Sequence, residues 1–109
     1  MSILHAQEGQ AINVAPFGRE LNTRRTVALF KSAQIEVIRL VLATGKSMPQ
    51  HKLAGDITIQ CLEGRLHVLW NGTSTELLPG ELLFLLGHMP HSVTALEDAS
   101  ALVTIVLHK

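Results

Sequence analysis

The sequence predicts an all-β domain, built as an antiparallel sandwich or barrel. Short β-prone runs recur roughly every 8–12 positions with turn residues between them, and no long run has the period of a helix. The chain has 109 residues, of which 47% are hydrophobic and 17% are charged. This length suits a single domain, and this composition excludes a disordered chain.

Four β-prone runs fill the first part of the chain. They are residues 26–30, 35–42, 56–62 and 65–70. The third run alternates polar and apolar residues, which places Ile57, Ile59 and Cys61 on one face of a strand. Residues 43–51 are predicted to form a loop, and residues 63–64 are predicted to turn the chain between the third and fourth runs.

Four more runs complete the predicted sheet. They are residues 75–78, 82–86, 92–96 and 101–107. Asn71 and Gly72 are the strongest hairpin signal, because both residues tolerate the positive φ of a type I′ turn. Residues 97–100 are predicted to be a turn between the last two strands. This many strands in one small domain matches a jelly roll or a related barrel, whose closure removes exposed sheet edges.

The predicted barrel occupies residues 26–109, and residues 1–25 form an N-terminal segment whose pattern is the least determined of the chain. This segment is predicted either to be loose or to form a strand that pairs with a neighbouring subunit. A helical turn is expected near residues 20–24.

Composition also limits the partners and the compartment. Cys61 is the only cysteine, which excludes an intrachain disulfide framework and a cysteine-rich zinc site. The apolar runs are too short to span a membrane, and the start of the chain lacks the pattern of a signal peptide, so a cytoplasmic protein is expected. The net charge is zero, and no aromatic residues are interleaved with the basic group Arg19, Arg24 and Arg25, which argues against a nucleic-acid partner.

Histidine is enriched in the chain, with six residues, and two of them stand where a barrel would open. His51 and His91 each lie at the edge of a predicted strand. Neutral imidazole is the commonest metal ligand and a good general base near neutral pH. A metal site requires three or four such groups to converge on one position.

The spacing of glycines and histidines between residues 45 and 95 resembles the two motifs of the cupin family. The first motif, G(x)5HxH(x)3-4E(x)6G, is matched at Gly45, His51 and Gly64, and the second, G(x)5PxG(x)2H(x)3N, at Gly80 and His91. The resemblance covers residues 26–107 and implies a small, RmlC-like jelly-roll barrel. It also implies a homodimer formed by sheet-to-sheet pairing.

Two of the four residues with which metal-binding cupins hold their metal are replaced in this chain. His51 and His91 are present, but Leu53 stands in place of the second histidine and Ile57 in place of the glutamate. His88, which stands where the family has glycine, is the third candidate ligand. The resemblance implies a divalent transition metal (zinc, nickel, iron or manganese) at these histidines, and we expect weak binding because the oxygen ligand is missing.

Apolar side chains are predicted to line a pocket beside the histidines. They are Leu53, Ile57, Ile59, Cys61, Phe84 and Leu86. With no tyrosine and a single tryptophan, the chain has few means to stack on a sugar or to enclose a cation. Arg39 interrupts an apolar strand, so it either extends outward to solvent, which we prefer, or anchors an anionic ligand.

The function predicted from these observations is the binding of a small, mostly apolar molecule inside a barrel with a partly degenerate metal site. The first alternative is a metal-dependent oxygenase or isomerase that uses His51, His91 and His88. The second is a ligand-sensing module that acts through a protein partner. The enzyme hypothesis differs from the other two because it requires all three imidazoles to converge on one metal position.

Overall fold

The computed structural model describes residues 5–51 and 54–107. Within these residues the chain is mostly antiparallel β-strand, which confirms the predicted fold class, and it contains no helix with the length and apolarity to cross a membrane. In chain order the elements are η1 (a 3-10 helix, Gly18–Thr23), β1 (Val27–Lys31), β2 (Ile35–Leu42), β3 (Ser47–His51), β4 (Ile57–Trp70), β5 (Thr73–Leu77), β6 (Leu82–Leu85) and β7 (His91–Val106).

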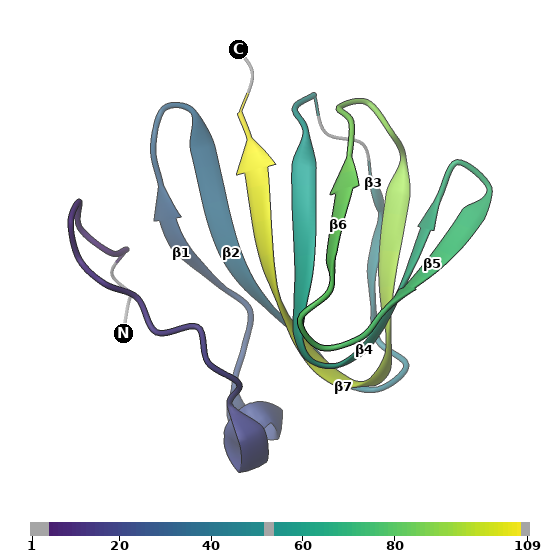
Figure 1. The fold of residues 1–109 in the computed structure, drawn as a ribbon, viewed down its shortest axis with the longest axis horizontal. Helices are drawn as coiled ribbons and strands as arrows, with labels where there is room; N and C mark the ends of the chain where they lie inside the picture. The colour runs from purple at the N-terminus through teal and green to yellow at the C-terminus, as the bar shows by residue number, and fades with distance from the viewer. Residues whose placement is uncertain (1–4, 52–53, 108–109) are drawn as a thin grey trace.

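The strands form two layers that share the long strands β4 and β7 (Figure 1). In the first layer the strand order is β1, β2, β7, β4 and β6. β2 pairs with residues 99–106 of β7, and residues 101–105 of β7 pair with residues 57–61 of β4. In the second layer, β3 pairs with the beginning of β7, and β5 pairs with residues 66–70 of β4. We call these layers sheet I and sheet II. Because β4 and β7 run through both sheets, the layers are joined as a jelly roll.

β4 and β7 bend together where they pass from one sheet to the other. The register of their pairing shifts on both sides of Glu63. The neighbouring Gly64 has a φ of 79°, and a Cβ atom at this position would collide with the carbonyl oxygen of Asp98, so the bend requires glycine. The predicted turns at residues 63–64 and 97–100 are therefore wrong, because both segments are bends inside continuous strands.

The other strand predictions differ from the structure mainly at one place. The hairpin between β4 and β5 is confirmed, with φ values of 47° at Asn71 and 70° at Gly72. Residues 47–51, which were predicted to belong to a loop, form β3. Pro49 interrupts the pattern there, and proline is tolerated in β3 because, within the part of the chain that the structure describes, this strand pairs on one side only, with β7.

The core lies between the two sheets, on the inward faces of the shared strands. In β4 the alternation predicted from the sequence places Ile57, Ile59 and Cys61 inward. The most buried members of the core are Ile59, Cys61, Leu66, Val68, Val93, Ala95, Ala99 and Ala101. Burial of a large apolar side chain contributes about 1.5–3 kcal/mol, so this cluster is the main source of stability.

The N-terminal segment packs against its own barrel. The N–H of Ala6 donates to the carbonyl oxygen of Leu29 in β1 (2.8 Å), and Leu21 is the buried residue of η1, which lies below the strands in Figure 1. The helical turn expected near residues 20–24 is confirmed as η1. Pairing of this segment with a neighbouring subunit stays a prediction.

Candidate functional site

Side chains of both sheets line a cavity of about 320 Å³ that is open to solvent, which we call the interior cavity. It is lined by Thr26, Ile38, Leu40, Leu42, Ser47, Met48, Ile57, Val103 and Ile105. None of these side chains is charged. The two polar ones, Thr26 and Ser47, are exposed, so the cavity meets solvent between the start of β1 and the start of β3.

Both hydroxyl groups at this mouth are hydrogen-bonded to the neighbouring strands. Thr26 Oγ1 accepts a hydrogen bond from the N–H of Val41 (2.9 Å) and donates to the carbonyl oxygen of the same residue (3.2 Å). Ser47 Oγ lies 2.6 Å from Thr94 Oγ1. A hydroxyl oxygen has two lone pairs, so the mouth can still accept a hydrogen bond from a ligand, but it presents no charge.

The structure brings only part of the predicted pocket lining to this cavity. Ile57 lines it, whereas Ile59 and Cys61 lie deeper in the packed core, with exposed fractions of 1% and 0%. Burial raises the pKa of the Cys61 thiol, which keeps it protonated and unreactive. Leu53 lies outside the described residues.

Phe84 and Leu86 do not line the interior. The register pairs Phe84 of β6 with Thr58 of β4, on the outer face of sheet I, and the two apolar side chains are 56% and 63% exposed. The prediction that they line the pocket is therefore corrected. Residues 82–86 are apolar at every position, so the sequence pattern does not show which side chains of this strand face inward.

His51 and His91 are directly opposite each other in the ladder between β3 and β7. His91 is 1% exposed, and its Nδ1 lies 3.0 Å from the carbonyl oxygen of Met89. A carbonyl oxygen only accepts, so Nδ1 carries the proton, and in the neutral ring Nε2 is then the nitrogen with a lone pair. The ring is thus held in the tautomer that metal-bound histidines commonly use.

The residues present do not fit the four-ligand metal site that the cupin resemblance implies. Ile57, at the position of the family's carboxylate, is an apolar core residue with an exposed fraction of 3%. His88 is exposed in the turn before β7, with a φ of 65°, so the structure does not bring it to His91 as a third ligand. Among the residues whose side chains the structure describes, which do not include His51, no three His, Cys, Asp or Glu side chains form a group that could hold a metal ion.

A buried polar cluster that sequence reasoning missed lies on the other face of sheet I. Arg39 is 2% exposed, and its Nη2 donates to the carbonyl oxygen of Ala15 (2.9 Å) and to Ser100 Oγ (3.1 Å) and lies 3.4 Å from Glu63 Oε2. The ring of Phe17 covers the guanidinium at 4.0 Å. The prediction that Arg39 extends to solvent is therefore wrong, because the N-terminal segment covers it.

Glu63 is the acceptor at the centre of this cluster. Its carboxylate accepts hydrogen bonds from Ser100 Oγ and from the backbone N–H groups of Phe17 (2.9 Å) and Gly18 (3.1 Å). Burial raises the pKa of Glu63, but these hydrogen bonds and the charge of Arg39 lower it by more, so the net pKa is below its usual value. The only sequence signal for this cluster is an arginine within an apolar strand.

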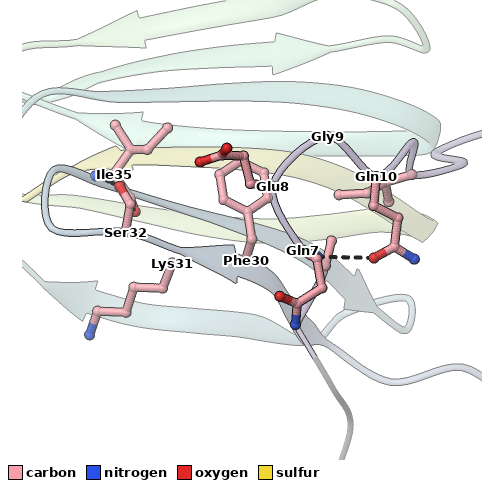
Figure 2. Close-up of a pocket in the computed structure, with 10 residues that line it drawn as sticks. Gln7, Glu8, Gly9, Gln10, Phe30, Lys31, Ser32 and Ile35 are labelled. Carbon is pink, nitrogen blue, oxygen red and sulfur yellow. Dashed lines mark hydrogen bonds between the residues drawn. The ribbon is translucent and has the colours of Figure 1, made fainter.

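Two larger hollows, of about 490 and 410 Å³, lie along the N-terminal segment outside the barrel. Figure 2 shows the first of them, where residues 7–10 arch beside Phe30 and Ile35 of the neighbouring strands. Six of its ten lining residues belong to this segment, and four of these six are exposed. The interior cavity is smaller, but core side chains form its walls, so it is the better candidate for a binding site.

Comparison with known proteins shows similarity in structure only. No family model and no curated protein matches the sequence. A cupin superfamily protein from Desulfitobacterium hafniense is 17% identical, with a TM-score of 0.75, over 91% of this chain and 100% of that one. An RmlC-like cupin from Desulfovibrio desulfuricans is 23% identical, with a TM-score of 0.69, over 94% and 97% of the two chains.

A third similar structure is a much longer enzyme, the salicylate 1,2-dioxygenase from Pseudoaminobacter salicylatoxidans. It is 21% identical, with a TM-score of 0.63, over 66% of this chain but only 21% of the dioxygenase. At such identities the likeness establishes the fold and nothing about the activity. The two sheets, the shared bent strands and these neighbours together show that the chain has the cupin fold, as a small RmlC-like jelly roll.

Proposed function

We propose that the protein binds a small, mostly apolar, uncharged molecule in the interior cavity and holds no metal tightly. The observation that carries this proposal is the lining of the cavity, in which Ile57 occupies the position of the family's carboxylate. A charge brought into such a site would lose its hydration without gaining a partner, which costs several kcal/mol. The lining therefore favours an uncharged ligand.

The size and chemistry of the cavity narrow the ligand further. A volume of about 320 Å³ is near the lower end of small-molecule sites. The lining contains no aromatic side chain, so a flat ring or a sugar gains no stacking. A compact aliphatic molecule with one hydroxyl or carbonyl group matches both the apolar walls and the hydroxyls of Thr26 and Ser47 at the mouth.

A metal-dependent oxygenase or isomerase is the second candidate. It is favoured by the pairing of His51 with His91 and by the orientation of the His91 ring against Met89. It is disfavoured by the exposure of His88 and by the apolar side chain at Ile57. Two imidazoles alone would bind zinc, nickel, iron or manganese weakly, because these metals need three or more protein ligands. A ligand-sensing module that acts through a protein partner is consistent with the same cavity.

We also propose that the protein is a homodimer and that it functions in the cytoplasm. Leu82, Phe84 and Leu86 form an exposed apolar strip on the outer face of sheet I, beside the uncharged Thr58 and Gln60 of β4. An uncharged apolar strip on an edge strand requires a cover to avoid aggregation. A second copy of the chain offers the same uncharged surface and needs no complementary charge.

The ligand proposal is tested with a matched pair of probes, 1-hexanol and hexanoate. Titrations are followed through the methyl resonances of Ile38, Leu42 and Ile105, which line the cavity. We expect 1-hexanol to shift these resonances and hexanoate to bind at least about tenfold more weakly, because burial of its charge is uncompensated. The variant Val103→Phe fills the cavity and should lose binding, whereas Leu82→Ala, on the outer strip, should retain it. Equal affinity for hexanoate, or unchanged binding in Val103→Phe, would contradict the proposal.

A further inference from the structure

Among the described residues that line the interior cavity, Met48 is the only one with a sulfur atom. The others carry aliphatic or hydroxyl side chains, which peroxides do not oxidise readily. We propose that Met48 is an oxidation site in the wall of the cavity, that its oxidant is a small aliphatic hydroperoxide bound there, and that the resulting sulfoxide weakens binding of the apolar ligand. The inference rests on the proposed ligand site and adds a means of regulating it.

The backbone of β3 directs Met48 toward the cavity. In the ladder between β3 and β7, Met48 lies opposite Val93, which is 1% exposed. Residues that are directly opposite in an antiparallel ladder project to the same face, so Met48 faces the interior between the two sheets, as Val93 does. It packs against the core cluster there and lines the cavity. The thioether therefore belongs to the wall that a bound ligand touches.

Met48 is also within reach of molecules that enter from solvent. The preceding residue, Ser47, is exposed and lines the same cavity, and Met48 itself is half-buried. The sulfur of a thioether keeps its lone pairs at every pH, so packing alone protects it from an oxidant. A small molecule that enters the cavity beside Ser47 therefore meets Met48 in the wall.

The lining of the cavity selects the kind of oxidant. It is mostly apolar and contains no charged side chain, so it disfavours a charged oxidant for the same reason that it disfavours a charged ligand. A small aliphatic hydroperoxide, such as tert-butyl hydroperoxide, has the compact apolar body and the single polar group that suit these walls. Binding beside Met48 raises the effective concentration of peroxide at the sulfur.

The reaction transfers one oxygen atom and needs no further reactant. A lone pair of the Met48 sulfur attacks the terminal oxygen of the hydroperoxide, so that an S–O bond forms and the O–O bond breaks. The alkoxide that leaves takes up the proton of the hydroperoxide and departs as the alcohol. The sulfur is oxidised by two electrons and the peroxide is reduced by two, which gives Met48 sulfoxide.

The sulfoxide makes the cavity less suitable for an apolar ligand. Oxidation converts a flexible apolar side chain into a polar one, whose new oxygen requires a hydrogen-bond donor. Of the residues that line the cavity, Thr26 and Ser47 have hydroxyl groups, and Thr26 already donates its hydrogen to the carbonyl oxygen of Val41. The sulfoxide therefore favours water in the cavity over an apolar molecule.

Met89 is an internal control for the oxidation step. It is half-buried and packs against the same core cluster as Met48, but it does not line the cavity. Peptide mass spectrometry during incubation with tert-butyl hydroperoxide measures oxidation of both residues. We expect the rate at Met48 to saturate with hydroperoxide concentration, to exceed the rate at Met89 at least about tenfold, and to fall when 1-hexanol is added. The rate at Met89 should rise linearly and should not respond to 1-hexanol.

Variants of Met48 test the effect of oxidation on the ligand. Met48→Leu keeps an apolar wall without sulfur, so its binding of 1-hexanol should be the same before and after treatment with the hydroperoxide. Met48→Gln introduces a polar group of similar length and should bind 1-hexanol at least about tenfold more weakly than the wild type without any oxidant. Met89→Leu is the matched control and should lose binding on oxidation as the wild type does.

The outcomes separate this inference from the proposed function. Equal oxidation of Met48 and Met89, a rate at Met48 that 1-hexanol does not slow, or full binding of 1-hexanol by the Met48 sulfoxide would each overturn the oxidation site. In those cases, binding of 1-hexanol by the untreated wild type would leave the ligand site intact. Failure of the untreated wild type to bind 1-hexanol would overturn the proposed function and the oxidation site together.

Discussion

At the scale of single residues, the chemistry of the barrel depends most on Ile57. The cupin resemblance places a carboxylate at this position, and the structure places there an apolar side chain that is 3% exposed and lines the interior cavity. A carboxylate would need a cation or several donors to be tolerated at this depth. Isoleucine removes that requirement and converts the same position into a wall for an apolar ligand.

Glu63 leads to a prediction for the dependence of stability on pH. Its pKa is lowered in the folded protein, so the ionised form stabilises the fold above the usual glutamate pKa, and this contribution is lost as pH falls through the lowered value. We expect Glu63→Gln to reduce the free energy of unfolding at neutral pH by about 3 kcal/mol, because Arg39 is left buried without its partner.

The same variant should flatten the loss of stability below about pH 5, where unfolded glutamates begin to protonate. Chemical denaturation at a series of pH values measures both effects. Asp98→Asn is the control, because hydrogen bonds from Thr44 lower the pKa of this exposed carboxyl and its removal leaves the contribution of Glu63 in place. An unchanged pH dependence in Glu63→Gln would show that the cluster does not stabilise the fold through this charge.

At the scale of elements, the edge strand β6 and the residue that follows it expose an apolar surface to solvent. Leu82, Phe84 and Leu86 are each more than half exposed, and their neighbours on β4 are uncharged. Short edge strands are usually protected by charge or by a cover, and the outward positions of β6 carry no charge. The strip is therefore the surface on which a second copy is expected to pack.

Dimerisation through β6 is tested by sedimentation equilibrium of the wild type and of Phe84→Glu. We expect a dimer that Phe84→Glu weakens by about a hundredfold or more, since the new charge would be buried without a partner. Leu69→Glu, at an exposed position of β4 in sheet II, is the matched control and should leave the dimer unchanged. A wild-type monomer at micromolar concentration, or a Phe84→Glu variant as dimeric as the wild type, would exclude this surface.

Some features of the elements could be predicted from the sequence, and others could not. The hairpin at Asn71 and Gly72 was predictable, because a type I′ turn depends on the local tolerance for positive φ. The bend at Gly64 was predicted as a turn, because glycine marks both features and only the pairing of β4 with β7 distinguishes them. The burial of Arg39 was not predictable, since it depends on the N-terminal segment, which folds over β2 from a distant part of the chain.

The candidate site, too, could be predicted only in part from the sequence. The motif spacing placed His51 and His91 together, and the ladder between β3 and β7 confirms that they are opposite each other. Leaving aside Leu53, which lies outside the described residues, the lining of the cavity was predicted only at Ile57, because a sequence pattern shows which residues share a face of a strand but not where the two sheets separate. Phe84 was wrongly predicted to line the cavity for a related reason. In a strand that is apolar at every position, the sequence does not show which side chains face inward.

At the scale of the whole molecule, two sheets joined by β4 and β7 form an apolar cavity that meets solvent at the exposed residues Thr26 and Ser47. The N-terminal segment is fastened to the barrel at Glu63, and the apolar strip of β6 lies on the outer face of sheet I. We propose that the cavity binds the ligand and that the outer strip associates with a second copy.

The central claim is that the interior is an apolar ligand site and not a tight metal centre. The most direct test is elemental analysis of the full chain, purified from cells grown with zinc, nickel, iron and manganese in the medium. Leu53→His/Ile57→Glu, which restores the two replaced ligand types, is the positive control and should gain metal. We expect the wild-type protein to carry far less than one metal ion per chain. A full equivalent of metal that is lost in both His51→Ala and His91→Ala would contradict the claim.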